Sequence, residues 1–470
     1  MEVSKELKYF DDLNIDLNLL VNSTLDVYEG CVLIINMEDK KKLNQRVSES
    51  LDKNVEVIIT SNNCDIDSDK IVKFENYELV FAHVLKKMLP NFTSKKFFGI
   101  TGTNGKTTTG YYLSQILGNN ALFIGTTEND LFKNITNEVH LTTPKLFNIF
   151  KLLRRKEYNH IENVILEVSS HALDQGRLQG INFKISGFTN LSQDHFDYHE
   201  NIDKYFGAKQ KLFHKNSSQQ FVYMDDEWGS KLNKVVNNVS NSIGFNKEND
   251  LFITSIEKKK NNTLIKFKVE NYDHTIELPF IGPNSEINYL LAVGMAYFSK
   301  TLKMSEILQN SIDISNPPGR FEKITFNSND IFIDYAHTPE AISSAIDVVR
   351  DIYTKVIVIL GAGGNRDIKK RQLMGKASNT ADKVIITNDN PRKEDPMDIA
   401  KEILSGVDLN SDVEIILDRK LAIKKGLELL QGDYVLLVLG KGHERTQELD
   451  VGLVDFDDSK VVKELISKEK

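Results

Sequence analysis

The stretch FFGITGTNGKTTTGYYLSQIL, residues 97–117, decides the fold of the middle of this chain. FFGI is a short apolar run typical of a strand, and KTTTGYYLSQIL has helical character. The turn TGTNG between them directs backbone N–H groups and the positive end of a helix at an anion. Gly102 and Gly105 supply a flexible backbone, Lys106 a mobile cation, and Thr107 a hydroxyl suited to Mg²⁺. We therefore expect a loop that binds the phosphates of a nucleoside triphosphate.

The spacing of this loop differs from the usual pattern, because Ile100 stands where a glycine is ordinarily found five residues before Gly105. The strand and helix on either side match the pattern even though the glycine count does not. The residues expected to contact the nucleotide are Thr101, Gly102, Thr103, Asn104, Gly105, Lys106, Thr107 and Thr108.

Composition places the chain among ordinary globular proteins. Its 470 residues predict about three domains. The net charge of −8 argues against a nucleic-acid-binding protein, although local basic pockets for small anions remain possible. Two cysteines are too few for a disulfide scaffold, and no apolar run approaches the length of a membrane span. We expect a cytoplasmic monomer that acts on small molecules.

The order of apolar runs predicts an α/β fold in three domains. Residues 30–36 and 54–60 read as strands of a small N-terminal α/β domain, and a helix over residues 79–89 is expected to end at Pro90. From residue 96 onward strands and helices alternate, which predicts a parallel sheet. The central strands are expected at residues 96–100, 121–124, 163–166, 185–189 and 220–223.

Two further features complete this organisation. Residues 258–278 alternate in polarity around a polar turn, which predicts an antiparallel appendage. SNPPGRFEKI, residues 315–324, breaks any helix, and strand–helix alternation then restarts in a doubly wound C-terminal domain. The domain boundaries expected from this pattern are 1–93, 94–316 and 317–470.

Polar residues follow two central strands at the point where each strand ends. EVSSHALDQGRL begins with Glu167, and NLSQDHFDYH contains Asp194, His195, Asp197 and His199. Since the carboxyl ends of parallel strands line the ligand crevice, a Glu and a His there are candidate Mg²⁺ ligands. Taken singly, each could equally be a satisfied polar residue.

The sequence resembles the Mur ligase family. The motifs that carry the resemblance occur in the family's order over roughly residues 95–450: GITGTNGKTTT, EVSSHALDQGRL, NLSQDHFDYH, YFGAKQKLF, PPGRFE, DYAHTPEA and GKGHE. The resemblance implies a three-domain Mur ligase architecture with a small N-terminal domain, a central P-loop ATPase-like domain and a Rossmann-like C-terminal domain. The family's own loop spacing accounts for Ile100.

The resemblance also implies a reaction, the ATP-driven formation of an amide. The D-Glu carboxylate of UDP-MurNAc-L-Ala-D-Glu would attack the γ-phosphate to give an acyl phosphate, and the amine of an amino acid would then displace phosphate. This chemistry belongs to the synthesis of peptidoglycan precursors for the cell wall. Bringing two anions together requires positive charge, supplied by Lys106 and two Mg²⁺ ions.

Carried over residue by residue, the resemblance assigns catalytic roles to Lys106, Glu167, His195 and Lys209. Thr107 and Glu167 would bind the Mg²⁺ at the phosphates, and His195 the second ion. Lys209 falls where the family carries a carbamylated lysine that binds metal, and the alternative is an unmodified surface lysine. Further nucleotide contacts are implied for Asn284, Asn288, Arg320, Asp334 and His337. A salt bridge at the domain joint is the alternative role for Arg320.

The two remaining substrates are assigned in the same way. The UDP-MurNAc-dipeptide would be held by Ser23, Thr142, Thr143, Ser169, Gln175 and Arg177. This sequence departs from the family at Lys145, at Pro283 and around Ser23, where the residues that flank the serine differ. The amino acid would be held by Arg366, Asp389, Asn390, Pro391, Arg392, Gly440 and Glu444.

The family motif Asp-Asn-Pro-Arg at residues 389–392 implies that the amino acid is meso-diaminopimelate. The physical argument agrees, because an arginine fork binds the distal carboxylate that lysine lacks and would repel the ammonium group of lysine. Lanthionine presents the same charges and stays open, as does lysine. A folylpolyglutamate synthetase-like ligase and a catalytically silent nucleotide-binding regulator are the more remote alternatives.

Overall fold

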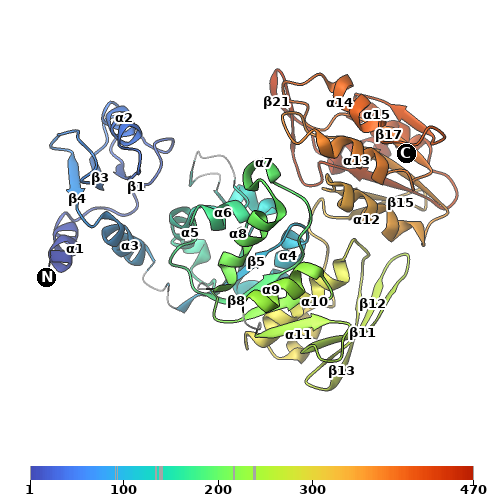
Figure 1. The fold of residues 1–470 in the computed structure, drawn as a ribbon, viewed down its shortest axis with the longest axis horizontal. Coiled ribbons are helices and arrows are strands. Elements are labelled where there is room, and N and C mark those ends of the chain that lie inside the picture. Colours follow the sequence, from blue (N-terminus) through green and yellow to red (C-terminus); the bar gives the residue numbers. More distant parts are fainter. Residues whose placement is uncertain are drawn as a thin grey trace. The chain divides into compact units, whose positions relative to one another are not determined.

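The computed structural model describes residues 2–89, 92, 94–132, 135–136, 141–214, 217–236 and 240–468 (Figure 1). The chain forms two compact units. The first consists of Met1–Lys96, Ile124–Val164 and Gln175–Ile181, and the second of Phe97–Phe123, Ile165–Asp174 and Asn182–Lys470. No helix in the described part of the chain is long and apolar enough to cross a membrane.

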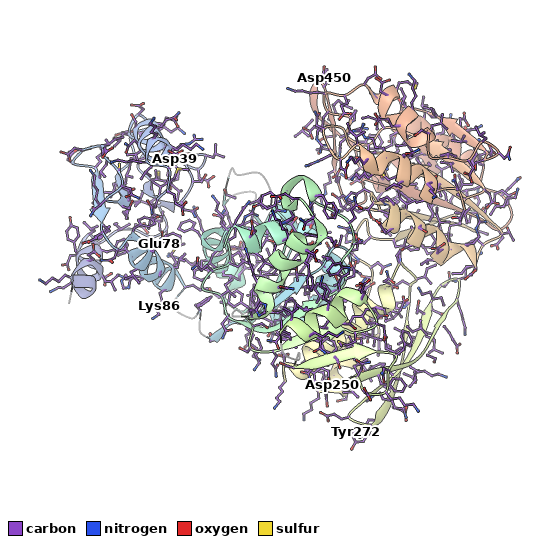
Figure 2. The ribbon with its side chains drawn as sticks, viewed as in Figure 1. Asp39, Glu78, Lys86, Asp250, Tyr272 and Asp450 are labelled. Atoms are coloured by element: carbon purple, nitrogen blue, oxygen red, sulfur yellow. The ribbon has the colours of Figure 1, made fainter. Side chains whose placement is uncertain are left out.

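The first unit contains a four-stranded parallel sheet in the order β1-β2-β3-β4. Its strands are β1 (Leu20–Val21), β2 (Val32–Ile34), β3 (Val57–Ser61) and β4 (Ile71–Phe74), and its helices α1 (Glu2–Asp12), α2 (Lys40–Leu51), α3 (Tyr77–Met88) and α5 (Leu146–Leu153). Asp39, labelled in Figure 2, begins α2 by accepting hydrogen bonds from the backbone N–H groups of Lys41 and Lys42. Cys31 and Cys64 are free and buried. Pro90, expected to end α3, lies outside the described residues.

The second unit is built on a nine-stranded sheet with the order β13-β12-β11-β10-β9-β8-β5-β7-β6. The strands expected to be parallel are present: β5 (Lys96–Thr101), β6 (Ala121–Ile124), β7 (Asn163–Glu167), β8 (Phe183–Phe188) and β9 (Gln220–Tyr223). Strand β5, which leads into the glycine loop, lies between β8 and β7 in the interior of the sheet. The carboxyl end of β5 is therefore flanked by the ends of two other strands.

The antiparallel appendage predicted at residues 258–278 begins earlier than expected. Strand β10 (Asn241–Gly244) pairs in parallel with β9, and the antiparallel strands are β11 (Leu251–Lys258), β12 (Thr263–Val269) and β13 (Tyr272–Leu278). Strand β11 was missed because buried and exposed side chains stop alternating in its second half. The pairing of β11 with β12 shifts register between Ile253 and Ser255. The sheet is consequently mixed.

Helices surround this sheet. They are α4 (Lys106–Leu117), α6 (Ser170–Asp174), α7 (Phe196–His199), α8 (Ile202–His214), α9 (Glu227–Val235), α10 (Ser285–Phe298) and α11 (Met304–Asn310). Helix α10 is apolar almost all round and fully enclosed, and it packs against α4 in the core beside β5. The helix that follows the glycine loop is thus anchored by burial along its length.

The C-terminal part of the second unit has a six-stranded sheet in the order β14-β15-β19-β16-β17-β18. Its strands are β14 (Glu322–Phe326), β15 (Asn329–Asp334), β16 (Lys355–Leu360), β17 (Lys383–Ile386), β18 (Val413–Ile415) and β19 (Tyr434–Leu439). Its helices are α12 (Pro339–Arg350), α13 (Lys369–Ala377), α14 (Pro396–Leu404), α15 (Arg419–Glu428) and α16 (Asp458–Lys468). Helices α12 and α14 begin as their sequences predict, with Thr338 or Asp395 as the N-cap and proline next.

The strand order explains why distant motifs meet in this domain. Strands β15, β19, β16 and β17 are adjacent and parallel, so the loops that follow them emerge at one edge of the sheet. Those loops contain residues 335–338, 440–445, 361–368 and 387–395. This edge is where ligands bind in doubly wound sheets.

Candidate active site

The glycine loop joins β5 to α4 with backbone conformations that only glycine adopts easily. Gly105, the N-cap of α4, has a φ of 83°, and a Cβ there would lie 2.4 Å from Oδ1 of Asn288. Gly102 has a φ of 152°, and a Cβ there would lie 1.8 Å from Oγ1 of Thr189. Both glycines are therefore required by close packing as well as by the turn.

The loop is also held by the end of strand β8. The Asn104 backbone N–H donates to Oδ1 of Asn190 at 3.0 Å, and the Asn104 carbonyl accepts from Oγ1 of Thr189 at 2.6 Å. The Thr103 N–H donates to the Asn190 carbonyl at 3.0 Å. These contacts fix the loop so that the first N–H groups of α4 are free of capping side chains, which suits an anion.

Lys106, Thr107 and Glu167 meet at the start of α4. The Thr107 hydroxyl donates to Oε2 of Glu167 at 3.0 Å, and Nζ of Lys106 lies 3.9 Å from Oε1 of the same carboxylate. Burial lowers the pKa of Lys106, although Glu167 and Asp194 act to raise it. A half-buried cation thus lies beside a hydroxyl and a carboxylate at the point where phosphate is expected.

Lys209 of α8 lies under the loop. Only 1% of the residue is exposed, so the alternative of a surface lysine is wrong. Its Nζ donates to the Gly102 carbonyl at 2.7 Å and lies 4.4 Å from the centre of the Tyr205 ring. Burial holds the pKa of Lys209 well below its ordinary value, and the charge of Lys106 lowers it further.

His195 has a φ of 54° and begins the short helix α7. Its Nε2 lies 3.4 Å from Oδ2 of Asp194, and its ring lies 4.9 Å from the ring of His171. Desolvation by the surrounding protein lowers the pKa of His195 to about 4 despite the opposing charge of Asp194, although 47% of the side chain is exposed. The imidazole is therefore neutral at pH 7, the form that can bind a metal ion. Nothing is described for the Asp197 side chain.

Five further residues expected at the nucleotide line one cavity of about 280 Å³, which also reaches Asn104, Gly105 and Thr108. They are Asn284, Asn288, Arg320, Asp334 and His337. The Arg320 guanidinium lies over the Tyr335 ring at 4.4 Å, and its Nη2 lies 3.5 Å from the Thr107 hydroxyl. No carboxylate within the described residues forms a salt bridge with Arg320, so the alternative of a joint salt bridge is not seen.

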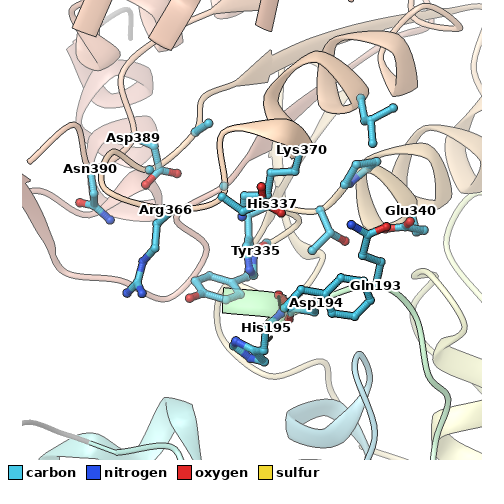
Figure 3. Close-up of a pocket in the computed structure, with 18 of the residues that line it drawn as sticks. Gln193, Asp194, His195, Tyr335, His337, Glu340, Arg366, Lys370, Asp389 and Asn390 are labelled. Carbon is cyan, nitrogen blue, oxygen red and sulfur yellow. Dashed lines mark hydrogen bonds and ion pairs between the residues drawn. The ribbon is translucent and has the colours of Figure 1, made fainter. Parts of the chain in front are cut away.

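A second cavity of about 260 Å³ lies where the C-terminal loops emerge (Figure 3). Every residue expected at the amino acid except Pro391 lines it: Arg366, Asp389, Asn390, Arg392, Gly440 and Glu444. Asp194 and His195, from the loop after β8, line the same cavity. Both signs of charge face this space, which suits an amino acid that carries both ammonium and carboxylate groups.

The loop residues in this cavity are connected by hydrogen bonds. Nδ2 of Asn390 donates to Oε2 of Glu444 at 2.9 Å, and Nζ of Lys441 contacts Oε2 of Glu444 at 2.8 Å. Burial would raise the pKa of Glu444, but Lys441 and Asn390 outweigh it and the pKa is lowered. Glu444 is consequently an ionised carboxylate with one oxygen already engaged.

The residues expected at the UDP-MurNAc-dipeptide lie mainly in the first unit. Arg177 donates through Nη1 to the Thr143 carbonyl at 3.1 Å and through Nη2 to Oε1 of Gln175 at 2.7 Å. Thr142 adjoins this group in sequence. The Ser23 hydroxyl accepts a hydrogen bond from the Leu25 N–H at 3.3 Å. In the second unit, Ser169 directly precedes α6, and its hydroxyl accepts a hydrogen bond from the Ala172 N–H at 3.2 Å.

Comparison with known proteins identifies the family. The Mur ligase middle domain matches residues 100–296, and the Mur ligase glutamate ligase domain matches residues 319–442. A Rickettsia montanensis protein named UDP-N-acetylmuramoyl-L-alanyl-D-glutamate–2,6-diaminopimelate ligase is 34% identical over 437 residues, which is 90% of either chain. The chain belongs to the Mur ligase family. The resemblance stated from the motifs is confirmed.

Solved structures agree with this assignment at the level of the fold. The structure of a UDP-N-acetylmuramoyl-L-alanyl-D-glutamate–2,6-diaminopimelate ligase has a TM-score of 0.65 at 24% identity and covers 96% of this chain and 94% of its own. The MurF ligase of Thermotoga maritima, solved in complex with ADP, has a TM-score of 0.66 at 17% identity and covers 97% and 99%. The predicted α/β multi-domain Mur ligase fold is therefore confirmed.

In this Mur ligase the donors expected for Mg²⁺ form a small set. Among the described residues, no three His, Cys, Asp or Glu side chains are close enough to hold a metal ion by themselves. The Thr107 hydroxyl and the Glu167 carboxylate nevertheless fit Mg²⁺, which commonly takes one or two protein oxygens and completes its shell with phosphate and water. Lys209 as a free amine does not fit, because its Nζ donates to a carbonyl.

Sequence reasoning missed two lysines of this Mur ligase. Lys370 of α13 lines the amino-acid cavity, and Figure 3 shows it beside His337. Lys441 is fully buried and joins Asn390 to Glu444. Lys441 lies inside the GKGHE motif, so a role in the site could have been predicted from the sequence. Lys370 lies in a KKR run, which is typical of an exposed helix surface and gives no such signal.

Proposed function

We propose that this chain joins meso-diaminopimelate to the D-Glu carboxylate of UDP-MurNAc-L-Ala-D-Glu with consumption of ATP, in peptidoglycan precursor synthesis. The observation that carries the proposal is the cavity where Arg366, Asn390, Arg392 and Glu444 face the same space as His195. The names of relatives at 34% identity support it. The expected cytoplasmic location and monomeric state stay predictions.

The reaction needs two displacements. An oxygen of the D-Glu carboxylate attacks the γ-phosphorus of ATP and ADP leaves, which converts a poor electrophile into an acyl phosphate. The substrate amine, having lost a proton, then attacks the acyl carbon. The tetrahedral intermediate collapses with loss of phosphate, and an amide remains. Lys106 and the N-terminus of α4 would neutralise the phosphates, while Arg320 would bind the nucleotide from the C-terminal side.

Mg²⁺ is part of the proposal. Thr107 and Glu167 would hold an ion at the phosphates, and its charge would offset the repulsion between two anionic reactants. His195 is proposed for a second ion, since its ring is neutral at pH 7. One cavity is lined by Asn104 and Asn288 and the other by Arg366 and Glu444, so ATP and the amino acid would each have a separate cavity.

Carbamylation of Lys209 is a further part of the proposal. A neutral amine attacks CO₂ and loses a proton to give a carbamate, and the burial that lowers the pKa of Lys209 favours the neutral form. A carbamate would replace a buried cation by an anion with two metal-binding oxygens. Incubation with ¹³C-labelled bicarbonate should give a carbamate NMR signal that is absent from Lys209→Met. A signal of equal size in both proteins would contradict this role.

The domain roles follow the same pattern. Residues 1–93 would bind the UDP end through Ser23, residues 94–316 would bind ATP, and residues 317–470 the amino acid. Thr142, Thr143, Ser169, Gln175 and Arg177 would contact the peptide end of the UDP-MurNAc-dipeptide. The contact of Arg177 with both Thr143 and Gln175 supports treating these three as one group.

The proposal is tested by measuring ADP release with ATP, Mg²⁺, UDP-MurNAc-L-Ala-D-Glu and one amino acid at a time. We expect turnover with meso-diaminopimelate, weaker turnover with lanthionine and little with lysine. Equal rates with lysine would overturn the arginine argument. No ADP release with any amine would favour a silent regulator, and release with a folate acceptor and glutamate would favour a folylpolyglutamate synthetase-like enzyme.

A further inference from the structure

The chain that follows the GKGHE loop forms a hairpin that is attached to the loop at residues 389–392, and Asp389, Asn390 and Arg392 of that loop line the amino-acid cavity. Its strands β20 (Thr446–Leu449) and β21 (Gly452–Asp455) pair antiparallel, and the turn at Asp450 is labelled in Figure 2. Strand β20 is attached to the loop at residues 389–392 by side chains and backbone. Nε2 of Gln447 donates to the Asp389 carbonyl at 2.6 Å, and the Glu448 N–H donates to Oδ1 of Asn390 at 2.9 Å.

Arg392 is the residue that the hairpin holds most closely. Its backbone N–H donates to the Glu448 carbonyl at 3.0 Å, and its Nε donates to Oε2 of Glu448 at 2.7 Å. Its Nη1 donates to the Gly364 carbonyl at 2.7 Å. Two edges of the guanidinium are thus fixed by the protein. Nη2 makes no hydrogen bond within the described residues, and Nη1 has a second N–H, so the guanidinium keeps donors for a carboxylate of the substrate.

Arg366 differs from Arg392 although both line the same cavity. Arg366 makes no hydrogen bond or ion pair with any residue that the structure describes, so no side chain there holds its guanidinium in place. Both arginines converge on Gly363, where an added Cβ would lie 3.1 Å from Nη1 of Arg392 and 3.7 Å from Cγ of Arg366. Arg392 therefore has a carboxylate partner in Glu448, while Arg366 has none among the described residues.

We infer that Glu448 is a specificity-determining positioning residue, which fixes Arg392 so that its outer edge binds the distal carboxylate of the amino acid substrate. The inference rests on the proposed function and adds a residue that the motifs do not contain. Holding an arginine in its binding rotamer removes an entropy cost from substrate binding, which strengthens binding without a new contact. Glu448 also lowers the net positive charge at the cavity, so that the fixed geometry of the fork, more than bulk charge, selects the substrate.

The position of Arg392 should affect only substrates that carry a distal carboxylate. A substrate that carries a distal carboxylate gains from the fixed fork, whereas lysine has no group to place there. Loss of the Glu448 contact should therefore weaken meso-diaminopimelate binding and leave the slow reaction with lysine unchanged. A purely structural role would lower both reactions together, and would also affect ATP.

The test measures KM and kcat for each substrate in Glu448→Ala, Glu448→Asp and Glu448→Gln. Alanine should raise the KM for meso-diaminopimelate about 3- to 10-fold, with kcat and the KM for ATP within about twofold of the wild type. Glu448→Asp keeps the charge, but its shorter side chain withdraws the oxygen from Nε of Arg392. Its KM for meso-diaminopimelate should therefore rise as it does in Glu448→Ala. Glu448→Gln keeps an oxygen that can accept the hydrogen bond from Nε of Arg392, so its KM for meso-diaminopimelate should stay near the wild-type value. Asp450→Ala, at the turn of the same hairpin, is the matched control.

A double-mutant cycle with Arg392→Ala ties the effect to Arg392. In that background Glu448→Ala should change the KM for meso-diaminopimelate by less than about twofold, because the group it positions is gone. A full additional loss, or an unchanged KM in the single variants while Arg392→Ala raises it, would overturn the inference. The wild type reports separately on the proposed function, since it must first release ADP with meso-diaminopimelate.

Discussion

The Lys370 ammonium lines the amino-acid cavity together with Asp194 and Asp389, and it makes no hydrogen bond or ion pair with the residues described. Burial lowers the pKa of Lys370, while Asp194 and Asp389 act to raise it. An uncommitted cation in this position can bind an anionic group of the substrate or of the acyl phosphate. A contact of that kind is worth about 1.5–3 kcal/mol.

Replacing Lys370 by alanine should therefore lower kcat/KM for the ligation about 10- to 150-fold. Lys370→Arg should recover part of the loss because it restores the charge. The neighbouring Lys369 is exposed, so Lys369→Ala is the matched control. Steady-state ADP release measures all three, and equal effects at Lys369 and Lys370 would remove Lys370 from the site.

His443 should govern part of the acid sensitivity of the fold. Burial lowers its pKa to about 3, and the charge of Arg320 lowers it further against Glu444. The unfolded chain, with a histidine pKa of about 6.5, binds more protons between pH 6.5 and pH 3. The contribution of the neutral His443 to the free energy of unfolding is therefore fully present above pH 6.5. It is lost progressively as the pH falls from 6.5 to 3.

His443→Asn should consequently lose less thermal stability than the wild type when the pH is lowered from 7 to 5. The measurement is the difference in Tm between the two pH values, compared with that of His214→Asn, which changes an exposed histidine on α8. If the wild type and His443→Asn lose the same number of degrees, protonation of His443 does not contribute.

At the scale of elements, a buried ion pair joins the helices behind the amino-acid loops. Arg419 at the start of α15 binds Asp458 at the start of α16 through Nε and Nη2, each at 2.7 Å, and both side chains are fully buried. Arg419 also donates to the carbonyls of Asn388 and Leu439, which end the segments before two substrate loops. The pair thus anchors both loops to the helical layer.

Asp458→Ala should destabilise the protein by about 3–5 kcal/mol, because it leaves the Arg419 charge buried without its partner. Glu464→Ala, which removes an exposed carboxylate from the same helix, should change the free energy of unfolding far less. Denaturant unfolding measures both, and similar small losses would show that water replaces the lost carboxylate. Arg419→Met combined with Asp458→Leu should be less harmful than Asp458→Ala alone.

Sequence patterns predicted most of these elements but not all of their contacts. The strand and helix alternation after residue 330 was correct because each element carries its own local period. The loops after β17 and β19 were recognised from residues 389–392 and 440–444. Glu448 and Lys441 were missed as positioning residues, because their roles depend on contacts with Arg392 and Asn390 more than fifty positions away in the chain.

At the scale of the whole molecule, nucleotide binding should increase the free energy of unfolding. A ligand that binds only the folded state adds about 2.7 kcal/mol at a concentration one hundred times its Kd. A nonhydrolysable ATP analogue with Mg²⁺ should therefore raise the Tm of the wild type. Lys106→Ala should remove most of the shift, because it deletes the cation at the phosphates.

Chelation tests whether the increase in Tm given by the nucleotide analogue depends on Mg²⁺. EDTA should reduce the shift given by the analogue, since without the ion the Glu167 carboxylate, which accepts a hydrogen bond from Thr107, would repel the triphosphate. An equal shift with and without Mg²⁺ would contradict the proposed ion. The same measurement with Lys5→Ala, a change on the exposed part of α1, controls for general effects of charge removal.

The sequence by itself determined the order of the elements, the phosphate loop and the polar residues that end each strand, because those features are written in short local patterns. Only the tertiary structure decided which strand ends meet. Strand β19 lies between β15 and β16, and this order brings Glu444 to Asn390 and Glu448 to Arg392. The physical reason is that strand pairing depends on the packing of distant segments, which no local period encodes.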